Sequence, residues 1–146
     1  MTPEVISLVK ESYSKVVLIS EQAAELFYQR LFTIAPDVKP LFRGDMKDQG
    51  RKLMATLGVV VGSLDRLDKI LPAVKELAVR HVGYGVEDRH YDMVGEALIW
   101  TLETGLGEGF TPAHKLAWLE TYTLLAGVMI EAGRAVEAEP SRRQVR

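Results

Sequence analysis

Hydrophobic side chains recur along this chain at spacings of three and four residues, which is the pattern of amphipathic helices. Such stripes run through residues 21–34, 47–65, 70–82, 88–104 and from 112 onward, and Thr2 with Pro3 opens a further helix before them. Ser20 and Asp88 stand where helix caps are expected. Alternation typical of strands never persists for five residues. We therefore predict an all-α domain of six to eight helices of unequal length.

One of these stripes contains a histidine. In "ILPAVKELAVRHVGYGV", residues 70–86, Val74, Leu77, Ala78 and His81 follow one another at i, i+3, i+4 and i+7. Two glycines, at 83 and 85, end the helix just after the histidine. A lone histidine on an apolar face is more often a core residue bonded to backbone than a metal ligand. The residues alone leave both interpretations open.

Composition narrows the class of protein. The chain has 146 residues, enough for one domain, and its 47% hydrophobic and 26% charged content is ordinary for a soluble protein. The net charge of −2 argues against a general nucleic-acid binder. Because there is no cysteine, disulfides, thiolate metal sites and cysteine nucleophiles are excluded. The N-terminus does not look like a signal peptide and no apolar run could span a membrane, so a cytoplasmic location is expected.

Several motifs, in order, resemble those of a known family. They are "ELFYQRLF" at 25–32, "PDVKPLF" at 36–42, "DQGRKLM" at 48–54, "HYDMVGEAL" at 90–98 and "AWLETY" at 117–122. With the segment around His81, they resemble the globins, specifically single-domain bacterial haemoglobins related to the haem domain of flavohaemoglobins. The resemblance covers residues 1–134 and implies a globin fold, a three-over-three helical sandwich around haem b. Residues 135–146 have no apolar period and are expected to be a disordered tail.

The resemblance assigns residues to the proximal side of the haem. His81 matches the proximal histidine, the metal ligand, and a neutral imidazole is a suitable axial ligand for haem iron. Phe42 matches the ring that stacks on the porphyrin, although a phenylalanine after a proline corner is usually core. Tyr91 matches the tyrosine that, with a glutamate on the last helix, hydrogen-bonds the proximal imidazole.

Three residues match the distal side. Tyr28 and Gln49 would be the hydrogen-bond donors that face bound ligand, and Leu53 would be the apolar wall. Without the resemblance, Tyr28 would be read as a core tyrosine and Gln49 as a solvated residue at a helix start. Glutamine also has a carbonyl group, so it could hold Tyr28 instead of the ligand.

At one position the chain departs from the family pattern. The expected proximal glutamate aligns with Gly133. Glu131 lies about 200° around the helix and should point elsewhere, whereas Glu137 lies one turn later and could reach only if the helix continues. Otherwise the carbonyl of Leu77, one turn before His81, is the expected acceptor for the imidazole.

The resemblance implies a haem b globin that binds oxygen at ferrous iron. The expected activity is conversion of nitric oxide to nitrate with electrons from a separate reductase, and oxygen storage or delivery is the alternative. A haem-free interaction module of the same fold is the competing class. Expected partners are O2, NO and other diatomic ligands, with no nucleic acid and no membrane, and the protein is expected to be a monomer or weak homodimer. His90 and His114 are expected to be neutral and exposed at helix starts.

Overall fold

Helices account for nearly all of the residues that the structure describes. The computed structural model describes residues 1–42 and 44–137, and no strand occurs among them. The α-helices are α1 Pro3–Val17, α2 Ser20–Ile34, α3 Met46–Gly62, α4 Leu67–Gly83, α5 Asp88–Leu106 and α6 Pro112–Glu137. Short 3-10 helices connect some of them: η1 Pro36–Leu41, η2 Leu64–Arg66 and η3 Gly107–Gly109. The prediction of an all-α chain is confirmed.

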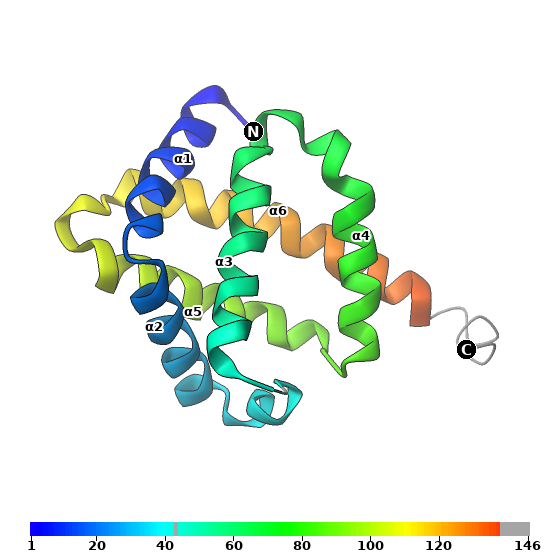
Figure 1. The fold of residues 1–146 in the computed structure, drawn as a ribbon. Coiled ribbons are helices and arrows are strands. Elements are labelled where there is room, and N and C mark those ends of the chain that lie inside the picture. Colours follow the sequence, from blue (N-terminus) through cyan, green and yellow to red (C-terminus); the bar gives the residue numbers. More distant parts are fainter. Residues whose placement is uncertain (43, 138–146) are drawn as a thin grey trace.

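The helices cross in two directions. In Figure 1, α3 and α4 run in front of α5 and α6 and cross them steeply. The most extensive helix packing joins α2 with α5 and α4 with α6, followed by α1 with α6. Trp118 of α6 donates its indole N–H to the hydroxyl of Ser12 on α1, 2.7 Å away in the core, so even the buried polar groups join these helices.

The helix starts are only partly as expected. Thr2 caps α1, because its hydroxyl accepts the N–H of Val5 at 3.2 Å. The prediction that Ser20 caps the second helix is wrong. Ser20 is itself helical, and Ile19 stands at the cap without a side-chain hydrogen bond.

Two helices start with a histidine that folds back on the backbone. In α5 the cap is Glu87 instead of the predicted Asp88, and the ring of His90 accepts the Glu87 N–H at 2.9 Å. At the start of α6 the ring of His114 accepts the N–H of Thr111 at 3.2 Å. Both histidines are buried, with 4% and 6% exposure, so the expectation that they are exposed is wrong. Their ring nitrogens bond to the helix start and hold the rings against it.

Helix boundaries differ from the sequence pattern by a few residues. The third helix ends at Gly62, short of the predicted residue 65, and the fourth begins at Leu67, so that Pro72 lies inside it. The last helix continues to Glu137, three residues beyond the expected end of the domain, and residues 138–146, where most of the expected tail falls, lie outside the described residues. Among the described helices, none is long and apolar enough to cross a membrane.

Candidate functional site

His81 lies near the C-terminal end of α4 and is held by its own helix. Its Nδ1 lies 2.8 Å from the carbonyl oxygen of Leu77, four residues earlier. A carbonyl can only accept, so Nδ1 carries the proton and Nε2 of the neutral ring keeps a lone pair. Nε2 has no hydrogen-bond partner among the described residues. The imidazole is therefore oriented from one side and has an available donor atom for a metal on the other.

The surroundings of His81 favour its neutral form. Burial lowers the pKa of the imidazole, the nearby charge of Arg80 lowers it further, and the bond to Leu77 opposes these effects. Tyr84 lies beside the ring, with the ring centroids 6.0 Å apart. Gly85 has φ +93°, a conformation that favours glycine, and there the chain turns away from the end of α4. A neutral histidine with a fixed tautomer is the form that ligates haem iron.

α6 approaches α4 closely beside this histidine. A Cβ atom built on Gly133 would lie 3.0 Å from Cγ2 of Val82, so the absence of a side chain allows the two helices to meet. Glu131 is exposed, in agreement with the expectation that it points elsewhere. The helix does continue through Glu137, whose side chain lies outside the described part of the structure. The observed acceptor for the imidazole is the Leu77 carbonyl, as expected in the absence of a glutamate.

Tyr91 lies in the first turn of α5 and is anchored through its backbone. Its carbonyl accepts the hydroxyl of Tyr122, 2.5 Å away on α6, and the ring of Tyr122 packs on Gly95. A Cβ at Gly95 would lie 2.7 Å from that ring, so only glycine fits. The hydroxyl of Tyr91 makes no hydrogen bond to any residue that the structure describes, His81 included.

The structure brings the two expected distal residues together. The hydroxyl of Tyr28, on α2, donates to the backbone carbonyl of Gln49, on α3, across 3.3 Å. Burial raises the pKa of Tyr28 to about 12, so the hydroxyl keeps its proton at neutral pH. Because 3.3 Å is a long hydrogen bond, the hydroxyl could turn to a better acceptor at little cost.

Phe42 belongs to an aromatic cluster around the same tyrosine. The ring of Phe42 meets Tyr28 edge to face at a centroid distance of 5.3 Å, and it meets Phe32 at 5.5 Å. Phe27 also meets Tyr28 edge to face, at a centroid distance of 5.1 Å. Such edge-to-face contacts fix ring orientations, so the aromatic ring of Tyr28 is held in place by its neighbours.

In the described part of the chain, the backbones of α3 and α4 do not pack closely on each other. α3 packs on α2 and α1, and α4 packs on α6, without close backbone packing between α3 and α4 over the described residues. Leu53, Leu57 and Val60 on α3, and Leu77 and His81 on α4, are only half-buried. An apolar surface with an available imidazole nitrogen fits the requirements of haem b, a flat apolar ring around a metal. His81 and Phe42 would hold the group, with Leu53 as part of the wall.

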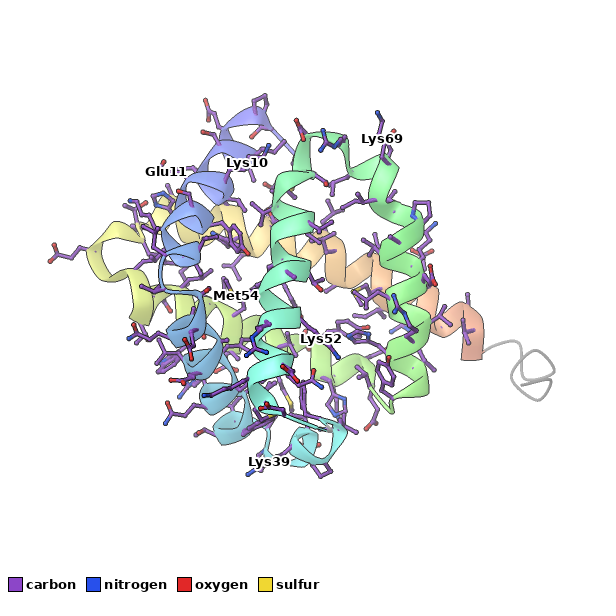
Figure 2. All side chains as sticks on the ribbon, viewed as in Figure 1. Lys10, Glu11, Lys39, Lys52, Met54 and Lys69 are labelled. Atoms are coloured by element: carbon purple, nitrogen blue, oxygen red, sulfur yellow. The ribbon has the colours of Figure 1, made fainter. Side chains whose placement is uncertain are left out.

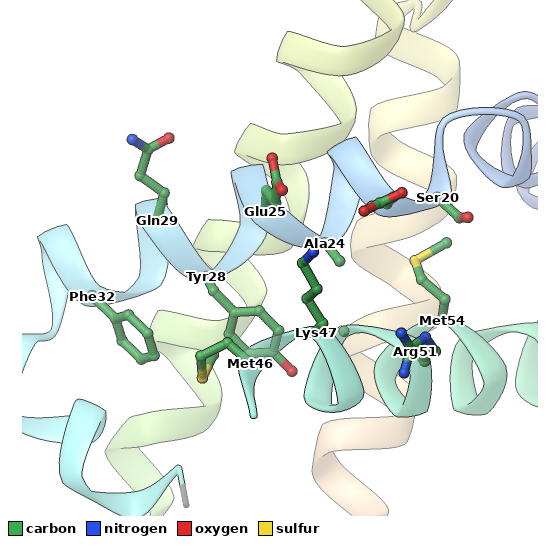
Figure 3. Close-up of a pocket in the computed structure, with 12 residues that line it drawn as sticks. Ser20, Ala24, Glu25, Tyr28, Gln29, Phe32, Met46, Lys47, Arg51 and Met54 are labelled. Atoms are coloured by element: carbon green, nitrogen blue, oxygen red, sulfur yellow. The ribbon is translucent and has the colours of Figure 1, made fainter. Parts of the chain in front are cut away.

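A separate groove lies between α2 and α3. Its volume is about 600 Å³, and its lining residues all come from these two helices. Figure 3 shows Tyr28 and Phe32 pointing from α2 toward α3, with Lys47 and Arg51 on α3. His81, Phe42 and Leu53 do not line it. The groove therefore reaches Tyr28 but does not include His81, Phe42 or Leu53.

Comparison with known proteins decides the family. A model of the globin family, "Globin", matches residues 25–129. The chain belongs to the globin family. The expected resemblance is thereby confirmed, and the all-α arrangement is the globin fold. Globins are haem proteins that bind diatomic ligands.

Individual relatives agree with this assignment. The chain is 30% identical to a flavohemoprotein of Bordetella parapertussis over 98% of this chain and 36% of that protein, so it spans about a third of that relative. It is also 30% identical to an uncharacterized globin-like protein of Aquifex aeolicus, over 96% of this chain and 99% of that protein.

Solved structures of similar shape are bacterial as well. One is an engineered carbene transferase made from an assumed nitric oxide dioxygenase of Rhodothermus marinus, with a TM-score of 0.86 and 25% identity over 97% of this chain and 99% of that one. Another is a globin of Campylobacter jejuni, with a TM-score of 0.82 and 25% identity over 94% and 99% of the two chains.

Three structural features around His81 and Tyr91 were not predicted from the sequence. They are the contact of Val82 with Gly133, the ring of Tyr84 beside His81, and the hydroxyl of Tyr122 on the Tyr91 carbonyl. Two of the three join helices that are distant in sequence, and single-helix periodicity carries no signal for such pairs. Tyr84 is three residues after His81, and that helical spacing could have indicated it.

Proposed function

We propose that this globin binds haem b through Nε2 of His81 and converts nitric oxide and dioxygen into nitrate. The observation that carries the proposal is the bond from His81 Nδ1 to the Leu77 carbonyl, which keeps the proton on Nδ1 and leaves the lone pair of Nε2 available for a metal. The relationship to flavohemoproteins supports the same reading.

When bound, ferrous haem supplies a reversible site for diatomic ligands and the redox chemistry of the reaction. One nitric oxide, one dioxygen and one electron give one nitrate ion, so sustained turnover requires an electron supply. We propose that a separate reductase provides it.

The protein's own groups have distinct tasks in this proposal. The Leu77 carbonyl orients His81, and Phe42 holds the ring and excludes water. Tyr28 keeps its proton because burial raises its pKa, so its O–H can donate to a ligand that gains negative charge. Gln49 is proposed as the second distal donor, and its backbone already positions Tyr28.

Oxygen storage or delivery is the second candidate, and one observation favours it. The proximal imidazole bonds to a backbone carbonyl, and Gly133 stands where the family pattern has a carboxylate. A carbonyl makes the histidine a weaker electron donor than a carboxylate does. Reversible binding needs less electron donation than chemistry on the bound ligand.

The test is the fate of nitric oxide. The haem-loaded, reduced protein in air-saturated buffer should consume nitric oxide and release an equal amount of nitrate when a chemical reductant is present. Stable oxygen binding without nitrate formation would favour storage. If the purified protein takes up no haem, as judged by the absence of a Soret band, the haem-free interaction module would be the correct class.

A further inference from the structure

Positive charge is concentrated in one stretch of the chain. Residues 36–83, which run from η1 to the end of α4, contain nine Lys and Arg against six Asp and Glu, a net charge of +3. The rest of the chain contains nine against fourteen, a net charge of −5. This third of the chain, which contains His81, Phe42 and Leu53, therefore differs in the sign of its net charge from the remainder.

Lysine and arginine side chains in the two parts of the chain also differ in how many of them form ion pairs. Outside residues 36–83, every Lys and Arg that the structure describes forms an ion pair: Lys10, Lys15, Arg30, Arg89, Lys115 and Arg134. Inside that stretch, only Arg51 is paired among the described residues, and seven exposed cations form no ion pair: Lys39, Lys47, Lys52, Arg66, Lys69, Lys75 and Arg80.

Acids within the stretch do little to offset these cations. Asp65 is paired with Lys10 of α1, and Asp37 is paired with Arg89 of α5, so both are occupied by cations from elsewhere. Asp48 forms an ion pair with Arg51. The three remaining acids, Asp45, Asp68 and Glu76, are fewer than the seven unpaired cations, so positive charge is in excess in this stretch.

Four of these cations lie on η1, α3 and α4, the elements that carry or adjoin Phe42, Leu53 and His81. Lys69 and Arg80 are eleven residues apart on α4, which puts them within about 20° on one exposed face. Lys52 is exposed on α3 directly before Leu53, and Lys39 lies on η1. Figure 2 shows Lys52 between Lys39 below and Lys69 above. We call Lys39, Lys52, Lys69 and Arg80 the basic face.

We propose that the basic face is the docking surface for an acidic electron-donor protein. The proposal rests on the proposed function, because it names the class of partner that would deliver the electron. A patch of one sign raises the association rate of a partner of opposite sign by about 10- to 1,000-fold, and a donor docked here would lie beside the candidate haem residues. The two carboxylates of haem b would neutralise two cations and leave the stretch positive.

A compact acidic protein fits this surface better than a polyanion does. The whole chain is negative, so a long nucleic acid or a broad anionic membrane would also meet the acidic remainder. Acids such as Asp68 and Glu76 are interspersed among the cations, as in protein interfaces that select one orientation. The preferred partner has a localised acidic patch around its own redox group.

The experiment uses a reduced, strongly acidic plant-type [2Fe–2S] ferredoxin as the probe. It is mixed with the ferric haem-loaded protein under carbon monoxide, without oxygen or nitric oxide, and reduction is followed by stopped flow. Binding of the oxidised ferredoxin to the haem-free and haem-loaded proteins is measured separately by sedimentation. The wild-type rate should fall as ionic strength rises, because salt screens the attraction.

Matched variants locate the surface. Lys52→Glu/Lys69→Glu changes one lysine on α3 and one on α4 within the basic face, and Lys47→Glu/Lys75→Glu makes the same change on the same helices outside it. At low salt the first variant should lose about tenfold in the second-order rate and in affinity, while the second should stay within about twofold of wild type. Unchanged circular dichroism and Soret spectra check that both variants fold and hold haem.

Several results would overturn the proposal. Equal losses in the two double variants would mean that net charge, not this face, governs association. A rate independent of salt would exclude an electrostatic docking surface. If the first variant lost binding only to phosphatidylglycerol vesicles, the face would be a membrane contact. Because no oxygen or nitric oxide is present, failure here leaves the proposed reaction untouched, and failure to form nitrate leaves the docking result standing.

Discussion

Gly133 of α6 lies against Val82 of α4, at a distance where a Cβ atom would come within 3.0 Å of Cγ2. Val82 is the residue after His81, so this contact lies beside the candidate iron ligand. In the family pattern a glutamate would stand at position 133. Here the space is used for helix packing, and the imidazole bonds to the Leu77 carbonyl.

Gly133→Glu should therefore have two effects. The new side chain must displace Val82, and overpacking of this kind costs roughly 1–3 kcal/mol in the free energy of unfolding. If the carboxylate then reaches Nδ1 of His81, the iron–histidine stretch of the ferrous, unligated protein should rise. Urea unfolding and resonance Raman spectroscopy measure the two effects.

Two further variants separate the effect of the added side-chain volume from the effect of the added negative charge. Val82→Ala combined with Gly133→Glu should recover part of the lost stability and keep the raised frequency, whereas Gly133→Gln should cost similar stability without the same rise. A high frequency in the unmodified protein would show that another acid already acts on the imidazole.

Tyr28→Phe should speed oxygen dissociation. The hydroxyl that donates to the Gln49 carbonyl is the proposed donor to bound ligand, and a net hydrogen bond is worth roughly 0.5–1.5 kcal/mol, or a few-fold to about tenfold in rate. Stopped-flow displacement of oxygen by carbon monoxide measures it.

The chain offers a matched control in Tyr13. Its hydroxyl also donates to a carbonyl of α3, that of Met54, at 2.7 Å. Tyr13→Phe should lower stability by about 1 kcal/mol and leave the dissociation rate unchanged. If neither Tyr28→Phe nor Gln49→Leu alters the rate, both residues lie outside the ligand shell.

The stability of the haem-free protein should depend on pH through His81. Burial lowers the pKa of the folded imidazole, whereas the unfolded chain keeps a value of about 6.5. Below that pH the unfolded state takes up a proton that the folded state binds less readily, so the free energy of unfolding falls as pH falls. Above about pH 6.5 the contribution disappears.

His81→Leu should remove this component. Relative to the variant, the wild type should lose stability on acidification by at most about 1.4 kcal/mol per pH unit, since one proton is involved. His90 and His114 are present in both proteins and cancel in the difference. Urea unfolding at several pH values between 5 and 8 provides the comparison, and parallel curves for the two proteins would contradict the lowered pKa.

The features that could be predicted from the residues alone are those that local helix geometry determines. The apolar stripe that places His81 and Leu77 on one face follows from 3.6 residues per turn, and a carbonyl four residues before a histidine is within reach in any helix. Tyr28, Gln49 and Phe42 were selected by resemblance, and the structure brings them to one cluster.

What the sequence could not predict depends on contacts between distant segments. The burial of His90 follows from its reciprocal bonds with Glu87 and from packing near η1, neither of which a helical pattern shows. A serine before an apolar run looks like a helix cap in the sequence. At Ser20 the helix starts one residue earlier than this pattern suggests, so the serine is itself helical. The Gly133–Val82 contact requires the crossing of two helices.

We propose that His81 ligates haem iron through Nε2, and resonance Raman spectroscopy of the ferrous, unligated protein reconstituted with haem b tests this ligation. The spectrum should contain an iron–histidine stretch that shifts with nitrogen-15 histidine, disappears in His81→Gly and returns when imidazole is added to that variant. The same band in His81→Gly without imidazole, or no such band in the wild-type protein, would contradict it.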